Sequence, residues 1–197
     1  MLYEELNTLP QIRQAAAAMG FVTLTEVQEK AIPVMQAGRD IIAKAPTGTG
    51  KTCAFGIPLI ERVDPEAKNP GAVVLAPTRE LAQQIAQDLR DLARFLPYVH
   101  VVCLYGGANM NRQIEQLKKG CQIVVATPGR LMDHMERRTI DIRSVQTVVL
   151  DEADEMLDMG FYKDVRKIID RMKARKQLAM FSATISREVM DIGWLYQ

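Results

Sequence analysis

Short apolar runs alternate with amphipathic stretches along the chain from residue 41 onward. The apolar runs are typical of buried β-strands and lie at residues 41–43, 72–76, 99–104, 122–126, 147–150 and 178–181. The stretches between them have helical periodicity at residues 53–60, 79–94, 110–119, 130–138, 162–172 and 187–195. Strands that are apolar on both faces and separated by helices indicate a parallel sheet covered on both sides. The pattern therefore predicts an α/β domain with a doubly wound, mostly parallel sheet.

The amino-terminal segment predicts helices instead of strands. Pro10 and the alanine-rich residues after it predict a helix over 11–19, and Thr25 begins a second helix. We interpret residues 1–36 as a helical lead-in and residues 37–197 as the α/β unit. Together they are expected to form one structural domain.

Composition and charge narrow the class of protein without selecting a partner. The chain has 25 basic and 24 acidic residues and a formal net charge of +1, so binding to a polyanion must depend on local geometry. Cys53, Cys103 and Cys121 lack metal-type spacing, and the last two are expected to be buried reduced thiols. The sequence has no signal-peptide pattern or membrane-length apolar run, so we expect a cytoplasmic protein without a membrane partner. The helical pattern at Gln197 lacks a stop signal, and we expect the natural chain to continue beyond it.

A glycine-containing loop joins the first predicted strand to the next helix. It consists of Ala45, Pro46, Thr47, Gly48, Thr49, Gly50, Lys51 and Thr52. This arrangement is typical of a P-loop, in which backbone N–H groups and a helix N-terminus bind phosphate. Lys51 is then expected to contact the β and γ phosphates of a nucleoside triphosphate, and Thr52 to hold Mg²⁺. The alternative is an ordinary strand-to-helix turn with a solvated lysine. The pattern usually begins with glycine, whereas Ala45 carries a Cβ and is expected to lack a positive φ.

Further turns between strands and helices carry threonine, proline, glycine and arginine. They comprise Pro77, Thr78 and Arg79 after one strand, Gly106 and Gly107 after another, and Thr127, Pro128, Gly129 and Arg130 after a third. In a parallel sheet these turns lie along the carboxyl edge, where helix N-termini and arginines bind anions. Helix capping by Thr78 or Thr127 is the simpler explanation of each turn alone. Several phosphate-sized sites along one edge favour a nucleic-acid backbone.

Acidic residues end the apolar run at 147–150. Asp151, at the tip of a buried strand in a chain with a P-loop, is expected to hold Mg²⁺. Glu152 is placed to polarise a water against the γ phosphate, which favours hydrolysis over transfer to another substrate. The alternative is that these acids cap the next helix, which accounts poorly for Asp151.

The sequence from Asp151 to Asp154 spells DEAD, and the whole chain resembles the first RecA-like P-loop domain of a DEAD-box RNA helicase of bacterial type. Phe21, Thr25 and Gln28 resemble the family's Q motif, the loop from Ala45 to Thr52 its motif I, the three turns its RNA-contacting elements, and Ser182 and Thr184 its motif III. The resemblance implies binding of ATP, Mg²⁺ and the RNA backbone. It also implies ATP hydrolysis that drives RNA unwinding when a second RecA-like domain is joined to this one, and little activity from the domain alone.

The resemblance assigns the Q-motif residues to the nucleotide base. Gln28 contacts the adenine edge and Phe21 stacks on the ring. Thr25-x-x-Gln28 is also a capping box, and both interpretations can hold together. Leu24 stands where the family usually has proline.

The remaining roles concern catalysis and coupling. The implied catalytic residues are Lys51, Asp151 and Glu152. Ser182 and Thr184 resemble residues that hydrogen-bond the turn at Asp154 and couple the nucleotide state to RNA. A helix N-cap is the alternative for both.

Two other classes of function fit parts of the sequence. A small P-loop kinase needs an acceptor pocket and a lid, whereas this chain has Glu152 beside Asp151 and a row of anion-binding turns. A binding module that holds nucleotide or RNA without turnover is the second alternative. The inferred RNA contacts go to phosphate and sugar, so the sequence identifies neither the RNA nor the pathway, and the oligomeric state is also open.

Overall fold

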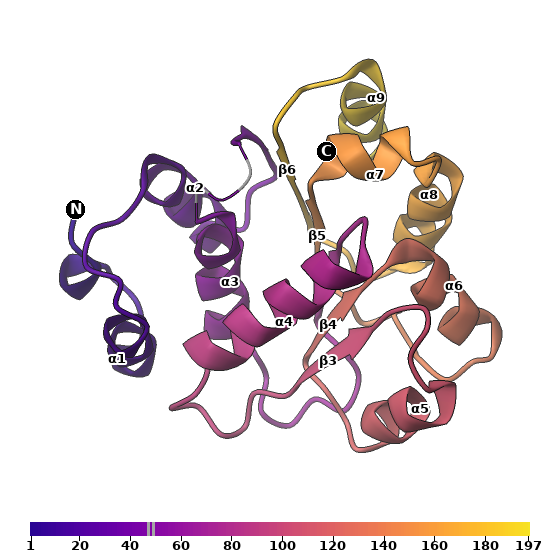
Figure 1. Ribbon diagram of the computed structural model, residues 1–197, viewed down its shortest axis with the longest axis horizontal. Helices are drawn as coiled ribbons and strands as arrows, with labels where there is room; N and C mark the ends of the chain where they lie inside the picture. Colours follow the sequence, from indigo (N-terminus) through magenta and orange to yellow (C-terminus); the bar gives the residue numbers. More distant parts are fainter. Residues whose placement is uncertain (47, 49) are drawn as a thin grey trace.

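A six-stranded parallel sheet organises the part of the chain that the computed structural model describes, which is residues 1–46, 48 and 50–197 (Figure 1). The strands are β1 (Ile41–Lys44), β2 (Ala72–Leu75), β3 (Val101–Leu104), β4 (Ile123–Ala126), β5 (Thr147–Asp151) and β6 (Gln177–Ser182). Their order across the sheet is β1-β6-β5-β2-β4-β3, and every pair is parallel. The predicted doubly wound α/β fold is therefore confirmed.

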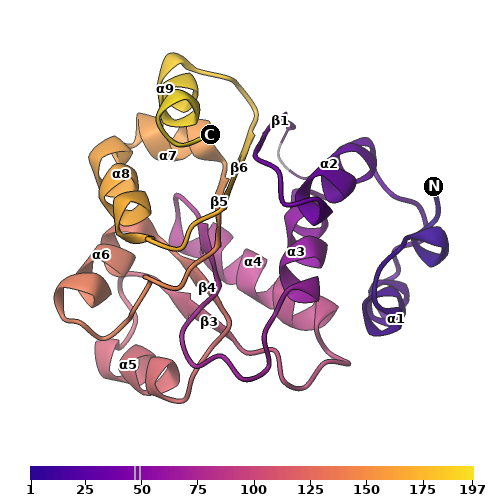
Figure 2. The same ribbon diagram turned by 180° about the vertical axis from the view of Figure 1, so that it is seen from behind.

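Helices cover both faces of this sheet. They are η1 (Tyr3–Glu5), α1 (Pro10–Ala18), α2 (Glu26–Gln36), α3 (Lys51–Glu61), α4 (Arg79–Leu92), α5 (Met110–Lys118), α6 (Pro128–Glu136), α7 (Ala153–Asp158), α8 (Tyr162–Arg171) and α9 (Arg187–Tyr196). One hydrophobic cluster contains residues of α1 to α4, and a second contains residues of α6 to α9. Figures 1 and 2 show these two groups of helices on opposite sides of the strands. Within β2, Val74 faces the first cluster while Val73 and Leu75 face the second, as strand alternation requires.

The amino-terminal lead-in packs into the same core as the P-loop helix. Tyr3, Ile12 and Ile32 are buried in the cluster that also contains Phe55 of α3. Leu2 and Thr23 form an isolated antiparallel bridge that closes the segment on itself. The lead-in is therefore held directly against the helix that follows the P-loop.

One helix was missed by the sequence prediction, and the start of another was misplaced. Helix α7 begins within the acidic tetrapeptide, and its length of six residues is too short for a clear helical period. Helix α6 begins at Pro128, earlier than predicted, because proline is well tolerated in the first turn of a helix.

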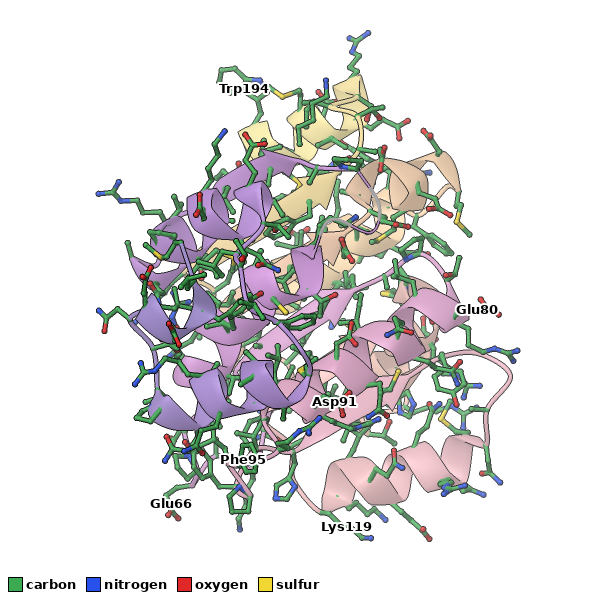
Figure 3. The ribbon with its side chains drawn as sticks, turned by 60° about the vertical axis from the view of Figure 1, so that its left-hand side comes forward. Glu66, Glu80, Asp91, Phe95, Lys119 and Trp194 are labelled. Carbon is green, nitrogen blue, oxygen red and sulfur yellow. The ribbon has the colours of Figure 1, made fainter. Side chains whose placement is uncertain are left out.

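Three further features of the fold are the buried cysteines, an exposed tryptophan on α9 and the character of the helices. Cys53, Cys103 and Cys121 are free and buried, and burial raises the pKa of Cys103 to about 11 and of Cys121 to about 12. Trp194 projects from α9 into solvent with 80% of its surface exposed (Figure 3). No helix in the described part of the chain has the length and apolar character needed to cross a bilayer.

Candidate active site

The P-loop begins where β1 ends and closes onto α3. Ala45 is buried, and its N–H donates to the carbonyl of Ser182 at 2.8 Å, which continues the β1–β6 pairing by one residue. Ala45 lacks a positive φ, as its Cβ requires, whereas Gly48 and Gly50 have φ of +83° and +78°. Thr47 and Thr49 lie outside the described residues. Thr52 lies half-buried in the first turn of α3.

Gly50 is in close contact with the Q-motif glutamine. A Cβ on Gly50 would lie 2.4 Å from Nε2 of Gln28, so a side chain there would displace the glutamine. Gln28 is buried, and its Nε2 donates to the carbonyl of Gly50 at 3.0 Å. This contact joins α2 to the P-loop directly.

The amide orientation of Gln28 is determined by its other partners. Its Oε1 accepts from the N–H of Thr25 at 3.0 Å and from the hydroxyl of Tyr3 at 2.6 Å. Thr25 Oγ1 accepts from the N–H of Gln28 at 3.4 Å, so the capping box is present. The ring of Phe21 stacks on Tyr3 with centroids 5.7 Å apart and remains 37% exposed. The capping and P-loop contacts of Gln28 therefore exist together.

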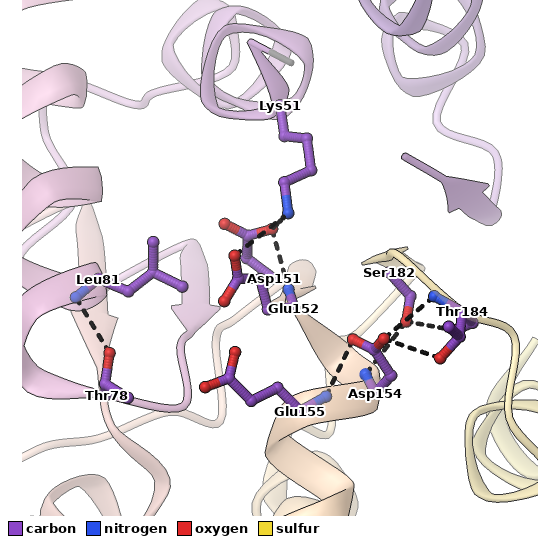
Figure 4. Close-up of polar contacts among 9 residues, drawn as sticks. All are labelled: Lys51, Thr78, Leu81, Asp151, Glu152, Asp154, Glu155, Ser182 and Thr184. Carbon is purple, nitrogen blue, oxygen red and sulfur yellow. Dashed lines mark hydrogen bonds and ion pairs between the residues drawn. The ribbon is translucent and has the colours of Figure 1, made fainter. Parts of the chain in front are cut away.

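The lysine of the P-loop faces the first two acids of the DEAD sequence (Figure 4). Lys51 Nζ lies 3.3 Å from Asp151 Oδ1 and 3.7 Å from Glu152 Oε1, and the side chains of Lys51 and Asp151 are only 6% and 2% exposed. Despite these ion pairs, Nζ of Lys51 has no hydrogen-bond partner within the described part of the chain. Burial raises the pKa of Asp151, and the nearby Lys51 offsets this shift only in part. A buried ammonium with unused donors, beside two carboxylates and a glycine loop, fits a nucleotide phosphate and Mg²⁺.

Asp154 connects the DEAD turn to the loop after β6. Its Oδ2 accepts from both the N–H and the hydroxyl of Thr184, at 3.0 and 2.8 Å, and its N–H donates to Ser182 Oγ at 3.1 Å. Burial alone would raise the pKa of Asp154, but hydrogen bonds from Thr184, from the N–H of Glu155 and from Ser182 together lower it. The N-cap of α9 is Ser186, so the alternative role of Ser182 and Thr184 as its caps is wrong.

The candidate RNA-contacting turns follow three neighbouring strands. β2, β4 and β3 lie side by side in the sheet, so the turns beginning at Pro77, Gly106 and Thr127 meet along one stretch of its carboxyl edge. Thr78 caps α4 by accepting from the N–H of Leu81 at 3.2 Å (Figure 4). Thr127 makes no side-chain capping bond. The capping explanation therefore holds for Thr78 and not for Thr127.

The arginines of these turns have different surroundings. Arg79 is exposed, and its Nη1 lies 3.1 Å from the position that a Cβ on Gly107 would occupy, where φ is +86°. Arg130 instead donates from Nη2 to the carbonyl of Ala108 at 3.0 Å, with Nη1 3.7 Å from the sulfur of Met110. Arg130 therefore holds the loop after β3 in place through its bond to Ala108. Pro128 is buried and Gly129 is exposed at the start of α6.

Comparison with known proteins matches residues 25–192 to the family model described as DEAD/DEAH box helicase. The chain belongs to this family. The family assignment covers the Q-motif threonine, the P-loop, the DEAD sequence and motif III in one continuous match.

Named members of the DEAD/DEAH box family resemble this chain along nearly all of its length. It is 46% identical over 191 residues to the ATP-dependent RNA helicase CshA of Listeria monocytogenes, a match that covers 97% of this chain and 36% of that protein. It is 46% identical over 179 residues to the RNA helicase CrhR of Synechocystis, covering 91% of this chain and 36% of that protein. The chain therefore spans little more than a third of the length of these relatives.

Solved structures give the same result for the fold. A DEAD box protein from Methanococcus jannaschii has a TM-score of 0.92 and 40% identity, covering all of this chain and 54% of that one. A hypothetical ATP-dependent RNA helicase from Sulfolobus tokodaii has a TM-score of 0.88 and 39% identity, covering 97% of this chain and 55% of that one.

Sequence inspection missed two residues that lie next to the candidate site. Tyr3 bonds Gln28 from 25 positions away, and no local pattern signals that contact. Glu155 lies one helical turn after Glu152, and hydrogen bonding to Glu152 raises its pKa. The spacing of acids at i and i+3 on a helix was the available signal for Glu155.

Proposed function

We propose that this chain is the ATP- and RNA-binding RecA-like unit of an ATP-dependent RNA helicase. Joined to a second RecA-like domain, it would hydrolyse ATP to separate RNA strands. The observation that carries the proposal is the buried ammonium of Lys51, which lacks a hydrogen-bond partner among the described residues and lies between Asp151 and Glu152. Residues 1–36 would serve as the Q-motif lead-in and residues 37–197 as the ATP-binding unit. The names of its relatives, which are RNA helicases, support the assignment.

Each group of the nucleotide has a matching set of residues. Gln28 and Phe21 would hold the adenine, and the loop from Ala45 to Gly50 would surround the phosphates through its N–H groups. Lys51 would bind the β and γ phosphates. Thr52 and Asp151 would hold Mg²⁺, which when bound neutralises charge on the phosphates.

Hydrolysis would depend on Glu152. Its carboxylate would orient the attacking water and accept a proton from it. Asp154, Ser182 and Thr184 would transmit the resulting change at the DEAD turn to the loop after β6, because their hydrogen bonds already join the two segments. The turns at Pro77, Gly106 and Thr127 would bind the RNA backbone without reading its sequence.

A binding experiment on the 197-residue chain tests the proposal. Fluorescent ADP should bind in Mg²⁺ and bind more weakly in excess EDTA, and a labelled single-stranded RNA should bind independently of its sequence. The kinase alternative would be favoured by phosphate transfer to a small acceptor. Absence of both ADP and RNA binding from a folded protein would contradict the proposal.

Gln28→Ala should weaken ADP binding and reduce the difference in affinity between ADP and GDP. The substitution removes the contact to Gly50 and leaves the hydroxyl of Tyr3 without its acceptor, a loss of roughly 1–3 kcal/mol for buried polar groups. Tyr3→Phe, which keeps the ring stacked on Phe21, should give a smaller change in the same direction. Titration calorimetry with both nucleotides measures these effects.

A hydroxyl deletion far from the loop provides the control for this series. Tyr196→Phe removes a 2.8 Å bond to Asp170 and should leave nucleotide affinity unchanged. Equal affinity of the unsubstituted chain for ADP and GDP would contradict the contact of Gln28 with adenine and support only its role in capping α2.

Arg130→Ala should weaken binding to all single-stranded RNAs about equally and reduce the slope of log affinity against log salt by roughly one unit. Fluorescence anisotropy on two unrelated sequences at several salt concentrations measures both quantities. Because Arg130 also bonds Ala108, Arg79→Ala serves as a comparison that leaves that bond intact. A loss confined to one RNA sequence would rule out recognition of the backbone alone.

A further inference from the structure

A second concave site lies at the opposite edge of the sheet from the P-loop. It is a pocket of about 610 Å³ whose walls include Pro70 before β2, Cys121 before β4, Ile142 before β5 and Lys173 before β6. Because the strands are parallel, residues that precede them lie at the amino edge, whereas the nucleotide and RNA turns follow them at the carboxyl edge. We call this site the amino-edge pocket.

Positive charge dominates the amino-edge pocket. Its cationic residues are Lys68, Arg138, Arg143, Arg171 and Lys173. The carboxylate among the lining residues is Asp141, which accepts from Nε and Nη2 of Arg143 at 3.1 and 2.9 Å. The other cations form no ion pair within the described part of the chain. In a chain whose net charge is only +1, these residues form a local excess of positive charge.

The floor of the pocket is apolar and attached to the core. Leu117, Met135 and Ile140 line it while packing against the hydrophobic cluster on the α6–α9 face. No aromatic ring appears among the described residues that line it. The pocket therefore offers a ligand apolar contacts and charged groups, but no aromatic ring on which a base could stack.

Arg138 occupies this pocket in a strained backbone conformation. It follows the end of α6 with a φ of 57°, a position at which glycine is the usual residue. The loop is held by buried His134, whose ring nitrogens lie 2.7 Å from Thr139 Oγ1 and 2.8 Å from Gln113 Oε1. A charged side chain kept where glycine would relieve strain is a mark of a functional position.

We propose that the amino-edge pocket binds the phosphates of an RNA backbone at a second, separate contact. Arginine presents a planar fork that matches phosphate, and cations from several loops match a polymer that carries one charge at each nucleotide. The lack of stacking rings argues for the backbone over an isolated nucleotide. The inference rests on the proposed RNA-binding function and extends it from single strands at the carboxyl edge to longer RNA.

The strands alone separate the two contacts by roughly 13–20 Å for four to six residues, and RNA must also pass around the helices that cover both faces of the sheet. A short RNA can therefore fill one edge only, whereas a longer RNA can reach both. A contribution of the amino-edge pocket should therefore appear only in the affinity for long RNA. The affinities for short RNA and for ADP measure binding at the carboxyl edge without any contribution from this pocket.

A charge reversal at the pocket is the first test. Arg171→Glu combined with Lys173→Glu should weaken binding of an RNA of about 30 nucleotides roughly tenfold and lower its salt slope by roughly one to two units. Binding of an RNA of about six nucleotides should stay unchanged, as should ADP binding. Lys163→Glu combined with Lys167→Glu is the matched control, because these exposed lysines lie on α8 outside the pocket.

Arg138→Gly is the second test, because it separates stability from binding. Glycine should raise the melting temperature by relieving the left-handed strain, while the lost charge weakens the long RNA severalfold. A purely structural role for Arg138 predicts higher stability with no loss of RNA affinity.

The outcomes distinguish this inference from the proposed function. Failure of the unsubstituted chain to bind ADP and short RNA would overturn the proposed function. Normal binding of both, with long-RNA affinity unaffected by the pocket variants or reduced equally by the α8 control, would overturn only the amino-edge pocket. Competition by polyglutamate as strong as by RNA of equal charge would replace RNA with an acidic protein segment as the occupant.

Discussion

Residues 1–197 alone should bind ADP and ATP with Mg²⁺ but hydrolyse ATP barely above background, and RNA should stimulate them little. Phosphoryl transfer needs positive charge around the γ phosphate, and Lys51 with Mg²⁺ supplies only part of it. Arg130 is bonded to Ala108, and Arg79 lies beside Gly107 at the candidate RNA-contacting turns, so the proposed function assigns both arginines to RNA and neither to the γ phosphate. An arginine finger changes turnover by roughly 10³–10⁵-fold in related NTPases.

Steady-state phosphate release with and without single-stranded RNA measures this effect. The comparison is with a protein in which a second RecA-like domain follows this unit and is expected to supply the finger. A parallel ADP titration shows that the low rate does not come from an empty site. Strong RNA-stimulated hydrolysis by residues 1–197 would mean that the catalytic charge is complete within them.

Glu152→Gln in the two-domain protein should lower ATP turnover by roughly 10²–10⁴-fold, the usual contribution of a positioned base. Glutamine keeps the shape of the side chain but cannot accept the proton from water. Lys51 and Asp151 remain, so affinity for ATP and Mg²⁺ should change much less than turnover. Single-turnover hydrolysis at saturating RNA separates the two quantities.

Glu155→Gln is the matched control for that experiment. Glu155 lies on α7 close to Glu152, which raises the pKa of the Glu155 carboxyl, and it forms no ion pair with Lys51 within the described residues. Its substitution should cost far less activity. A fall of less than tenfold for Glu152→Gln, or equal falls for both variants, would contradict the role of Glu152 as the base.

The sequence was sufficient to predict features that depend on neighbouring residues. Each strand and most helices follow from local periodicity, and glycine and proline mark their ends. The order of P-loop, DEAD sequence and motif III identified the family before any geometry was known. The parallel pairing of the strands then brings Lys51 within 3.3 Å of Asp151, although one hundred positions separate the two residues in the sequence.

Features that depend on distant residues were beyond the sequence. The bonds from Tyr3 to Gln28 and from Arg130 to Ala108 require the folded arrangement of separate loops. The charge of the amino-edge pocket comes from Lys68, the loop after α6 and the end of α8, which no window of sequence contains together. The composition gives only the net charge of +1, and this total does not show where positive side chains gather on the surface.

The place of β1 at the rim of the sheet has a consequence for how the protein is made. Within the described residues, the strand that leads into the P-loop pairs with β6, and Leu178 bonds the side chain of Asp40 from 138 positions away. At a synthesis rate of roughly 5–20 residues per second, on the order of ten seconds pass between the two segments leaving the ribosome. Throughout that interval the strand that leads into the P-loop lacks its β6 partner, so the proposed ATP site is among the last parts of this unit to be completed.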